Sequence, residues 1–171
     1  MLQKRDAMVE QWADWLGERI GSRGTIPRQL VTRELSLLIN VMAQTVGPLR
    51  REVMPLWHRT CEHYGRVAAA RGLAAGEVVE ELQFLRELLI RNLSNILAGL
   101  RARQGMATML RLNRVLDRGI GVAVVGYTDA LIATLFAQNG VPSADSDLDP
   151  AEVARQLDAI ERELKPMTAV L

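Results

Sequence analysis

Apolar residues recur every three or four positions along most of this chain, and this spacing restricts the fold to packed helices. The longest stripes run through residues 75–100 and 106–137. No segment shows the alternation of apolar and polar residues that a half-buried strand needs. Only 4% of the residues are aromatic, and Leu, Ala, Arg and Glu dominate, which also favours helix over strand. The sequence therefore predicts an all-α protein.

Glycine and proline place the ends of the predicted helices. Gly47-Pro48 ends a helix that starts near Pro27, and Gly72 is placed to cap the next helix. Asp149-Pro150 starts the last one, because Asp is a favoured N-cap and Pro a favoured first helical residue. We predict helices over residues 6–20, 27–46, 52–71, 75–100, 106–137 and 150–165. About five long helices should form a globin-like or helical-bundle domain, followed by a C-terminal helix. On facing long helices of this domain we expect four buried residues: Leu85, Leu89, Leu116 and Ile120.

The chain divides by composition into three parts. Residues 1–137 form the helical domain, residues 138–149 a flexible linker rich in Asp, Ser and Pro, and residues 150–171 an amphipathic helix and tail. A helix of about four turns is marginal in water unless its apolar face docks on something. The last helix is therefore predicted to pack on the helical body, in one chain or across a dimer, or to bind an output partner, through the stripe Val153, Leu157, Ile160 and Leu164.

Charge and cysteine content limit the partners and the compartment. The chain has 21 Lys and Arg against 20 Asp and Glu, a formal net charge of +1, so no overall field favours nucleic acid or an anionic membrane. A single cysteine, Cys61, cannot form an internal disulfide, which suits a reducing cytoplasm. The most apolar run, residues 119–127, is about half the length of a membrane crossing. We expect a soluble, cytoplasmic protein without a nucleic-acid or membrane partner.

The residues that could carry chemistry are few. No glycine-rich phosphate loop, zinc-protease motif or ordered Ser–His pair is present, so we expect no catalysis. His58 and His63 are the only candidate cofactor ligands, and five residues of helix turn them about 140° apart, so they cannot hold one metal ion together. Either could still be an axial haem ligand, although we expect no cofactor. Glu77, Glu80 and Glu81 are interpreted as a solvated first helical turn.

Tryptophans and glycines inside the predicted helices are interpreted as packing residues. Trp12, Trp15 and Trp57 are expected in the core, although exposed tryptophans would indicate a protein interface. Gly119 and Gly121 lie within a predicted helix and therefore indicate close packing or a bend, not a phosphate cradle.

Two stretches resemble a known family. The first runs from Tyr64-Gly-Arg through Arg71-Gly-Leu to residues 76–86, GEVVEELQFLR, and the second is LNRVLD at 112–117 followed by Tyr127. They resemble the N-terminal domain of RsbR- and RsbRD-type stressosome co-antagonists, and the resemblance covers roughly residues 8–136. It implies a non-haem globin-like sensor domain that forms a homodimer and works upstream of an output module.

The expected function follows from this resemblance together with the absence of catalytic motifs. We expect a bacterial signalling domain, active in stress response, that dimerises and binds a protein partner. The alternative is a small-molecule sensor that binds haem or an apolar ligand in its core. No STAS, GAF or kinase domain follows Pro166, so the chain is either a sensor that acts in trans or the first part of a longer protein.

Overall fold

The computed structural model describes residues 4–20, 27–138 and 149–168, and these form helices joined by short connections. The described ranges contain no strand, which confirms the all-α prediction. The predicted linker falls mostly on residues 139–148, which lie outside the described residues. The helices are α1 (Arg5–Ile20), α2 (Arg28–Thr45), α3 (Arg50–Ala70), α4 (Ala75–Ala98), α5 (Ala102–Gln138) and α6 (Pro150–Thr168).

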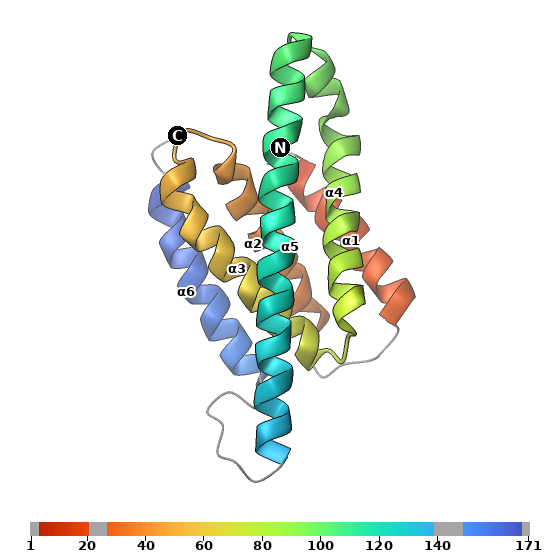
Figure 1. The fold of residues 1–171 in the computed structure, drawn as a ribbon, viewed down its shortest axis with the longest axis vertical. Coiled ribbons are helices and arrows are strands. Elements are labelled where there is room, and N and C mark those ends of the chain that lie inside the picture. Colours follow the sequence, from red (N-terminus) through yellow and green to blue (C-terminus); the bar gives the residue numbers. More distant parts are fainter. Residues whose placement is uncertain (1–3, 21–26, 139–148, 169–171) are drawn as a thin grey trace.

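Helix α3 lies at the centre of the fold and packs most extensively against α5. Figure 1 shows α5 running the full length of the molecule across the front of the other helices. Helix α4 pairs with α5 on one side, and α2 packs on α3. Helix α6 covers α2 and α3, and α1 closes the opposite side by packing on α2 and α4. The six helices therefore form one body around α3.

Most helix ends fall where the sequence predicts them. Gly72 adopts a φ of +75°, the left-handed conformation that favours glycine, and ends α3 as predicted. The Asp149 side chain accepts a hydrogen bond from the Ala151 N–H at 3.2 Å, which confirms it as the N-cap of α6. Helix α6 continues past Pro166 to Thr168. The prediction was wrong about the start of α5, which begins at Ala102, four residues earlier than expected.

Two glycines let α3 and α5 touch backbone to backbone. A Cβ added to Gly65 would lie 1.8 Å from the Ala123 carbonyl oxygen. A Cβ added to Gly126 would lie 2.2 Å from the Glu62 carbonyl oxygen. Neither backbone can move aside as a flexible side chain can, so any larger residue must push the helices apart. The glycine positions therefore fix the distance between α3 and α5.

Hydrogen bonds between side chains and backbone reinforce this contact. The Trp57 ring of α3 donates from Nε1 to the Val115 carbonyl oxygen of α5 at 3.1 Å. At the other end of the helix pair, the Tyr127 hydroxyl donates to the Leu73 carbonyl oxygen at 2.8 Å. Both bonds join segments more than fifty residues apart, so they fix the register of α5 on α3.

All six helices contribute to a single apolar core. Trp12 and Trp57 are fully buried, as predicted, and Trp15 is half-buried and stacks on Phe84 with ring centroids 4.5 Å apart. Four residues were predicted to be buried on the facing long helices. Leu85, Leu89 and Leu116 are buried, and Ile120 is half-buried.

Candidate functional site

The apolar stripe of α6, predicted to dock on the body or to bind a partner, is packed inside the protein. Val153 and Leu157 are fully buried, and Ile160 and Leu164 keep only 8% and 6% of their surface exposed. Their helix lies against α2 and α3 of the same chain. These four residues therefore belong to the core in this structure, and binding of an output partner through them would require α6 to leave the body.

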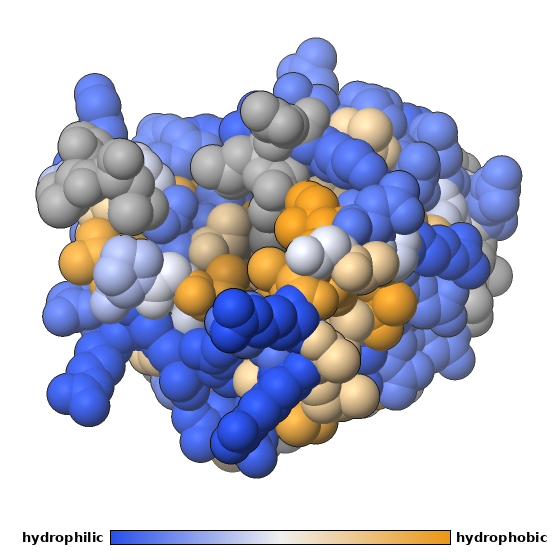
Figure 2. Space-filling model, turned by 90° about the horizontal axis from the view of Figure 1, so that it is seen from above, coloured by the Kyte–Doolittle hydropathy of each residue, from blue (hydrophilic) through white to orange (hydrophobic). Residues whose placement is uncertain are grey.

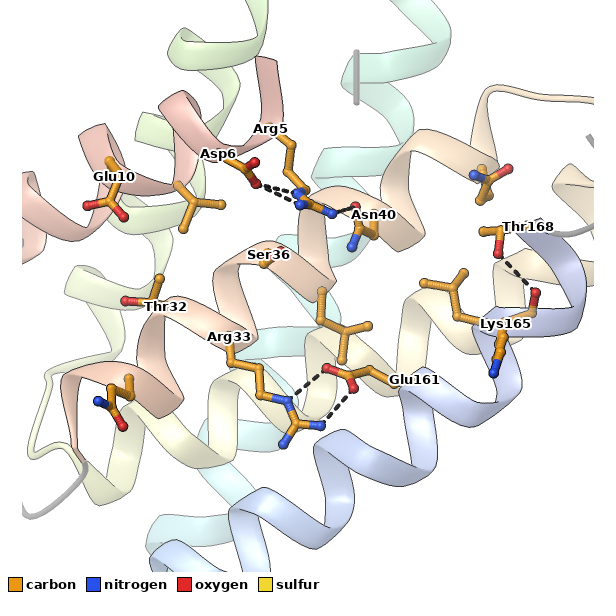
Figure 3. Close-up of a pocket in the computed structure, with 15 residues that line it drawn as sticks. Arg5, Asp6, Glu10, Thr32, Arg33, Ser36, Asn40, Glu161, Lys165 and Thr168 are labelled. Carbon is orange, nitrogen blue, oxygen red and sulfur yellow. Dashed lines mark hydrogen bonds and ion pairs between the residues drawn. The ribbon is translucent and has the colours of Figure 1, made fainter. Parts of the chain in front are cut away.

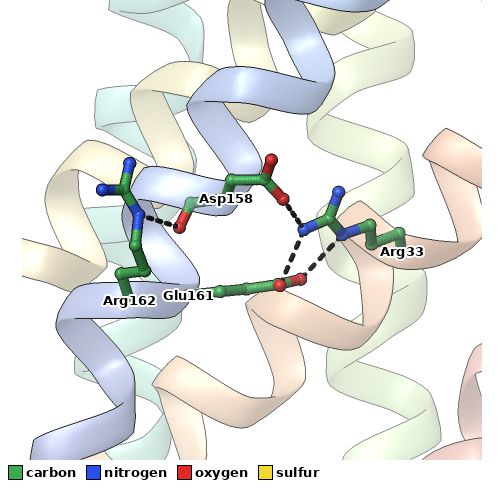
Figure 4. A network of polar contacts seen from close by, with 4 residues as sticks. All are labelled: Arg33, Asp158, Glu161 and Arg162. Carbon is green, nitrogen blue, oxygen red and sulfur yellow. Dashed lines mark hydrogen bonds and ion pairs between the residues drawn. The ribbon is translucent and has the colours of Figure 1, made fainter.

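Ion pairs line both edges of α6. Arg33 of α2 donates to the two carboxylate oxygens of Glu161 at 2.8 and 2.7 Å and also pairs with Asp158 (Figure 4). On the other edge, Arg59 of α3 pairs with both oxygens of Glu163, and its hydrogen bonds lower the pKa of that carboxyl. Exposed ion pairs contribute at most about 1 kcal/mol each. They orient α6, while apolar burial holds it.

A depression of about 760 Å³ lies between α1, α2 and α6. Figure 3 shows two pairs of charged side chains on its lining that point toward each other: Arg5 pairs with Asp6 at 2.7 Å, and Arg33 pairs with Glu161. Small-molecule sites are usually apolar clefts with a few convergent polar groups. The arginines of this depression are already paired, so it is a weak candidate for a ligand site.

The two histidines occupy different environments. His58 is half-buried, whereas His63 is 5% exposed and places Nε2 3.7 Å from the Glu34 carboxylate. Burial lowers the pKa of His63 to about 4, so the ring is neutral at pH 7. His63 lines a shallow depression of about 270 Å³, together with Arg59 and Arg66; His58 does not line it. A charged depression of this size does not resemble an apolar haem pocket.

A buried cluster of polar side chains joins α3 to α4. Glu81 is only 2% exposed, so its interpretation as a solvated first-turn carboxylate was wrong. Its Oε2 accepts a hydrogen bond from Arg71 at 2.8 Å and another from the Tyr64 hydroxyl. Burial raises the pKa of Glu81 and that of Tyr64, while the nearby Arg71 guanidinium opposes both shifts. Glu77, in contrast, caps α4 by accepting the Ala74 N–H at 2.7 Å.

Glu34 of α2 is fully buried, and its burial was not predicted from the sequence. Neither of its carboxylate oxygens accepts a hydrogen bond from the described residues. Burial therefore raises the pKa of Glu34 well above its ordinary value, even with Arg71 nearby. A signal for this position was present, because Glu34 lies one helical turn from both Leu30 and Leu38 on the inward stripe of α2.

Glu34→Gln should stabilise the protein increasingly as the pH rises. The folded wild type holds the Glu34 proton to a higher pH than the unfolded chain does, so its free energy of unfolding falls as the pH rises above 4.5. Glutamine removes this dependence, so the stability gain of the variant should grow between about pH 6.5 and pH 9, by at most about 1.4 kcal/mol per pH unit. This range avoids His63, whose lowered pKa of about 4 costs stability only below 6.5.

Urea denaturation at each pH measures the effect. Glu10→Gln, an exposed residue of α1, controls for the loss of one carboxylate. A stability difference between the Glu34→Gln variant and the wild type that stays constant over this range would contradict a protonated Glu34.

Most of the exposed large apolar residues that the structure describes lie on α5 or at the end of α4. At the end where α4 meets α5, four exposed residues gather, and Figure 2, which looks down on this end, shows apolar side chains among charged ones. A second exposed group lies on the C-terminal half of α5. The first group is Ile96, Leu100, Met106 and Leu110, and the second is Val125, Leu131, Ile132, Leu135 and Phe136. Contiguous exposed apolar surface is typical of a binding site.

Helix α5 is also long and apolar enough to cross a membrane, by length and composition alone. The expectation of a soluble protein considered only the run at residues 119–127, which is about half the length of a crossing. Only Asp129 is charged between Arg118 and the end of the helix, and 11% of the apolar 18-residue window is buried. The helix is therefore unusually exposed for a core helix, so its outer face is the candidate functional site.

Comparisons with known proteins identify no relative. No family model matches the chain, and no curated protein or solved structure matches it.

Proposed function

We propose that this chain is a non-catalytic regulatory module that binds proteins, including a second copy of itself, through the exposed faces of α4 and α5. The observation that carries this proposal is the exposed apolar surface of α5, of which Met106 and Val125 are 63% and 56% exposed. Burial of such surface is the main favourable term in protein association. The charged depressions elsewhere on the molecule offer no comparable driving force.

The resemblance to stressosome co-antagonist domains supports a signalling role in the cytoplasm and a globin-like arrangement. The residues that carry the resemblance have structural roles in this protein. Tyr64, Arg71 and Glu81 form the buried polar cluster, and Tyr127 bonds to the Leu73 carbonyl. A domain that shares these residues would share the packing of α3, α4 and α5. On the basis of this resemblance we propose that the chain is a sensor domain that passes its signal to a kinase, phosphatase or switch protein.

Light scattering tests the self-association. At tens of micromolar the mass should be twice the chain mass of 19.0 kDa. Leu131→Glu with Ile132→Glu places two charges on the exposed apolar face of α5 and should give a monomer of unchanged helicity. Glu18→Gln, an exposed change on α1, is the control and should remain dimeric.

Calorimetric titration tests the output. A purified signalling protein encoded beside the gene should bind the wild type, and the same α5 double substitution should weaken that binding if the partner shares the face. A monomeric wild type that binds no such protein would contradict the proposed function.

A further inference from the structure

The outer face of α5 carries one ridge of exposed residues whose spacing is the same from either end of the helix. The steps between successive members are four, four, three, four, four, three, four and four residues. Every member has a partner eleven residues away, which is three helical turns, so the ridge runs almost straight along α5. The members are Met106, Leu110, Arg114, Asp117, Gly121, Val125, Thr128, Ile132 and Phe136.

The two ends of the ridge also match in chemistry about its midpoint, Gly121, whereas the inner members Arg114 and Asp117 correspond to Thr128 and Val125. Both ends are large and apolar, with Met106 matching Phe136 and Leu110 matching Ile132 at equal distances from Gly121. A surface that is complementary to itself after a half-turn is what a two-fold symmetric dimer requires. In Figure 1 no helix described by the structure lies in front of α5.

From this pattern we infer that two copies of the chain pair antiparallel along the α5 ridge, with Gly121 of each copy at the two-fold axis. The inference rests on the proposed dimer and specifies its surface, direction and register. In this register Met106 meets Phe136 of the second copy, and Leu110 meets Ile132 of the second copy. Two apolar clusters therefore close, one on each side of the axis.

Charge complementarity favours the antiparallel direction. Arg114 then lies opposite Thr128 and beside Asp129 of the second copy, which gives two such ion pairs per dimer. Within the part of the chain that the structure describes, neither Arg114 nor Asp129 has an ion pair, whereas Asp117 is already paired with Arg86. A parallel pairing would instead bring Arg114 against Arg114, and like charges in an interface oppose association.

The glycine at the axis permits a close approach. A Cβ added to Gly121 would meet no atom of its own chain within 4 Å, so packing inside the chain gives no reason for glycine there. Glycine lowers helix stability by about 1 kcal/mol relative to alanine, and a helix crossing is one place where its small size is useful.

The same ridge is a poor surface for lipid. Arg114 and Asp129 lie on or beside it, and a charged side chain at the centre of a bilayer costs about 2.5–3.5 kcal/mol on insertion scales. A second copy can pair these charges, whereas hydrocarbon cannot. The observations therefore favour a protein partner over a membrane.

Disulfide cross-linking tests the register in the full chain. Gly121→Cys should form a disulfide with its own copy across the axis under mild oxidation. Thr128→Cys, on the same ridge, should not, because the two copies of residue 128 would be about 21 Å apart, beyond disulfide range. The cross-linked fraction should differ at least about tenfold between these variants. The parent protein is the control, since Cys61 is fully buried and burial raises the pKa of its thiol.

Charge reversal gives an independent readout. Arg114→Glu alone and Asp129→Arg alone should each weaken the dimer about tenfold, measured by sedimentation velocity as a function of concentration. The double variant should recover the wild-type dissociation constant, because the pair is restored with the charges exchanged. A double variant that is weaker than both single variants would overturn the assigned pair.

The outcomes separate this inference from the proposed function. Cross-linking at Gly121→Cys without cross-linking at Thr128→Cys supports the antiparallel register. Equal cross-linking at both positions means a parallel pair and overturns it. A dimer by light scattering in which neither cysteine cross-links means that another surface is used, which overturns the inference but leaves the proposed dimer intact. A monomer that floats with phosphatidylethanolamine and phosphatidylglycerol vesicles overturns both.

Discussion

Gly126→Ala should destabilise the protein by about 3 kcal/mol or prevent its folding. The added methyl group would lie 2.2 Å from the Glu62 carbonyl oxygen, and only separation of α3 from α5 relieves this contact. Such a separation would also stretch the hydrogen bonds that Trp57 and Tyr127 make between distant segments. Urea denaturation followed by circular dichroism measures the loss.

Gly76→Ala is the matched control for this substitution. Gly76 also lies in a helix, but a Cβ there would meet no atom within 4 Å. Its replacement should leave stability unchanged or raise it by up to about 1 kcal/mol through better helix propensity. If the two alanine variants unfold at the same urea concentration, α3 and α5 are not in backbone contact.

Deletion of residues 143–171 should unfold or aggregate the chain. It removes the four buried side chains of α6, each of which stabilises the fold by about 1.5–3 kcal/mol through burial. The sum is comparable to the whole stability of a typical domain. The loss of the α6 stripe also exposes the apolar surface of α2 and α3 that it covers.

Arg33→Ala controls for the loss of the ion pairs alone. It removes the two ion pairs with Asp158 and Glu161 but leaves α6 in place, so it should cost at most about 2 kcal/mol. A deletion variant with the thermal stability of the wild type would show instead that α6 is dispensable to the core, as a detachable regulatory arm would be.

Periodicity and helix-ending residues were enough to predict the helices, but not every boundary. The predicted helices end at residue 100 and begin again at residue 106, so Gly105 was expected in the connection between them. In the structure Gly105 is buried inside α5, where an added Cβ would lie 3.1 Å from the Leu97 carbonyl oxygen. The glycine serves close packing of α4 on α5, and sequence alone does not distinguish this role from a helix stop.

The buried polar residues were harder to predict than the core. Glu81 follows two acidic residues at the start of a helix, a context that indicates solvent, and only its contacts with Tyr64 and Arg71 reveal its burial. These partners are seventeen and ten residues away in sequence. Their meeting depends on the angle between α3 and α4, which no local pattern encodes.

The exposed ridge of α5 was not predicted from the sequence, for a different reason. The sequence predicts a long helix over residues 106–137, but only the unbroken apolar run at 119–127 within it was compared with the length of a membrane crossing. The structure shows one continuous helix from Ala102 to Gln138. Apolar residues occur around most of that helix, so both its buried and its exposed faces satisfy the same periodicity. Which face is covered depends on where Gly65 and Gly126 join it to α3.

The position of α6 has a consequence for synthesis of the chain. Helices α4 and α5 are adjacent in sequence and can pair as soon as both leave the ribosome. Helix α2 can pair with α6 only much later, because Arg33 and its partner Glu161 are 128 residues apart. Until then α2 and α3 expose the apolar surface that α6 finally covers. Chains with such surface are prone to aggregate during folding and are bound by chaperones. The nascent protein therefore remains prone to aggregation until α6 has been made and packed. Slow translation beyond residue 138 would lengthen that period.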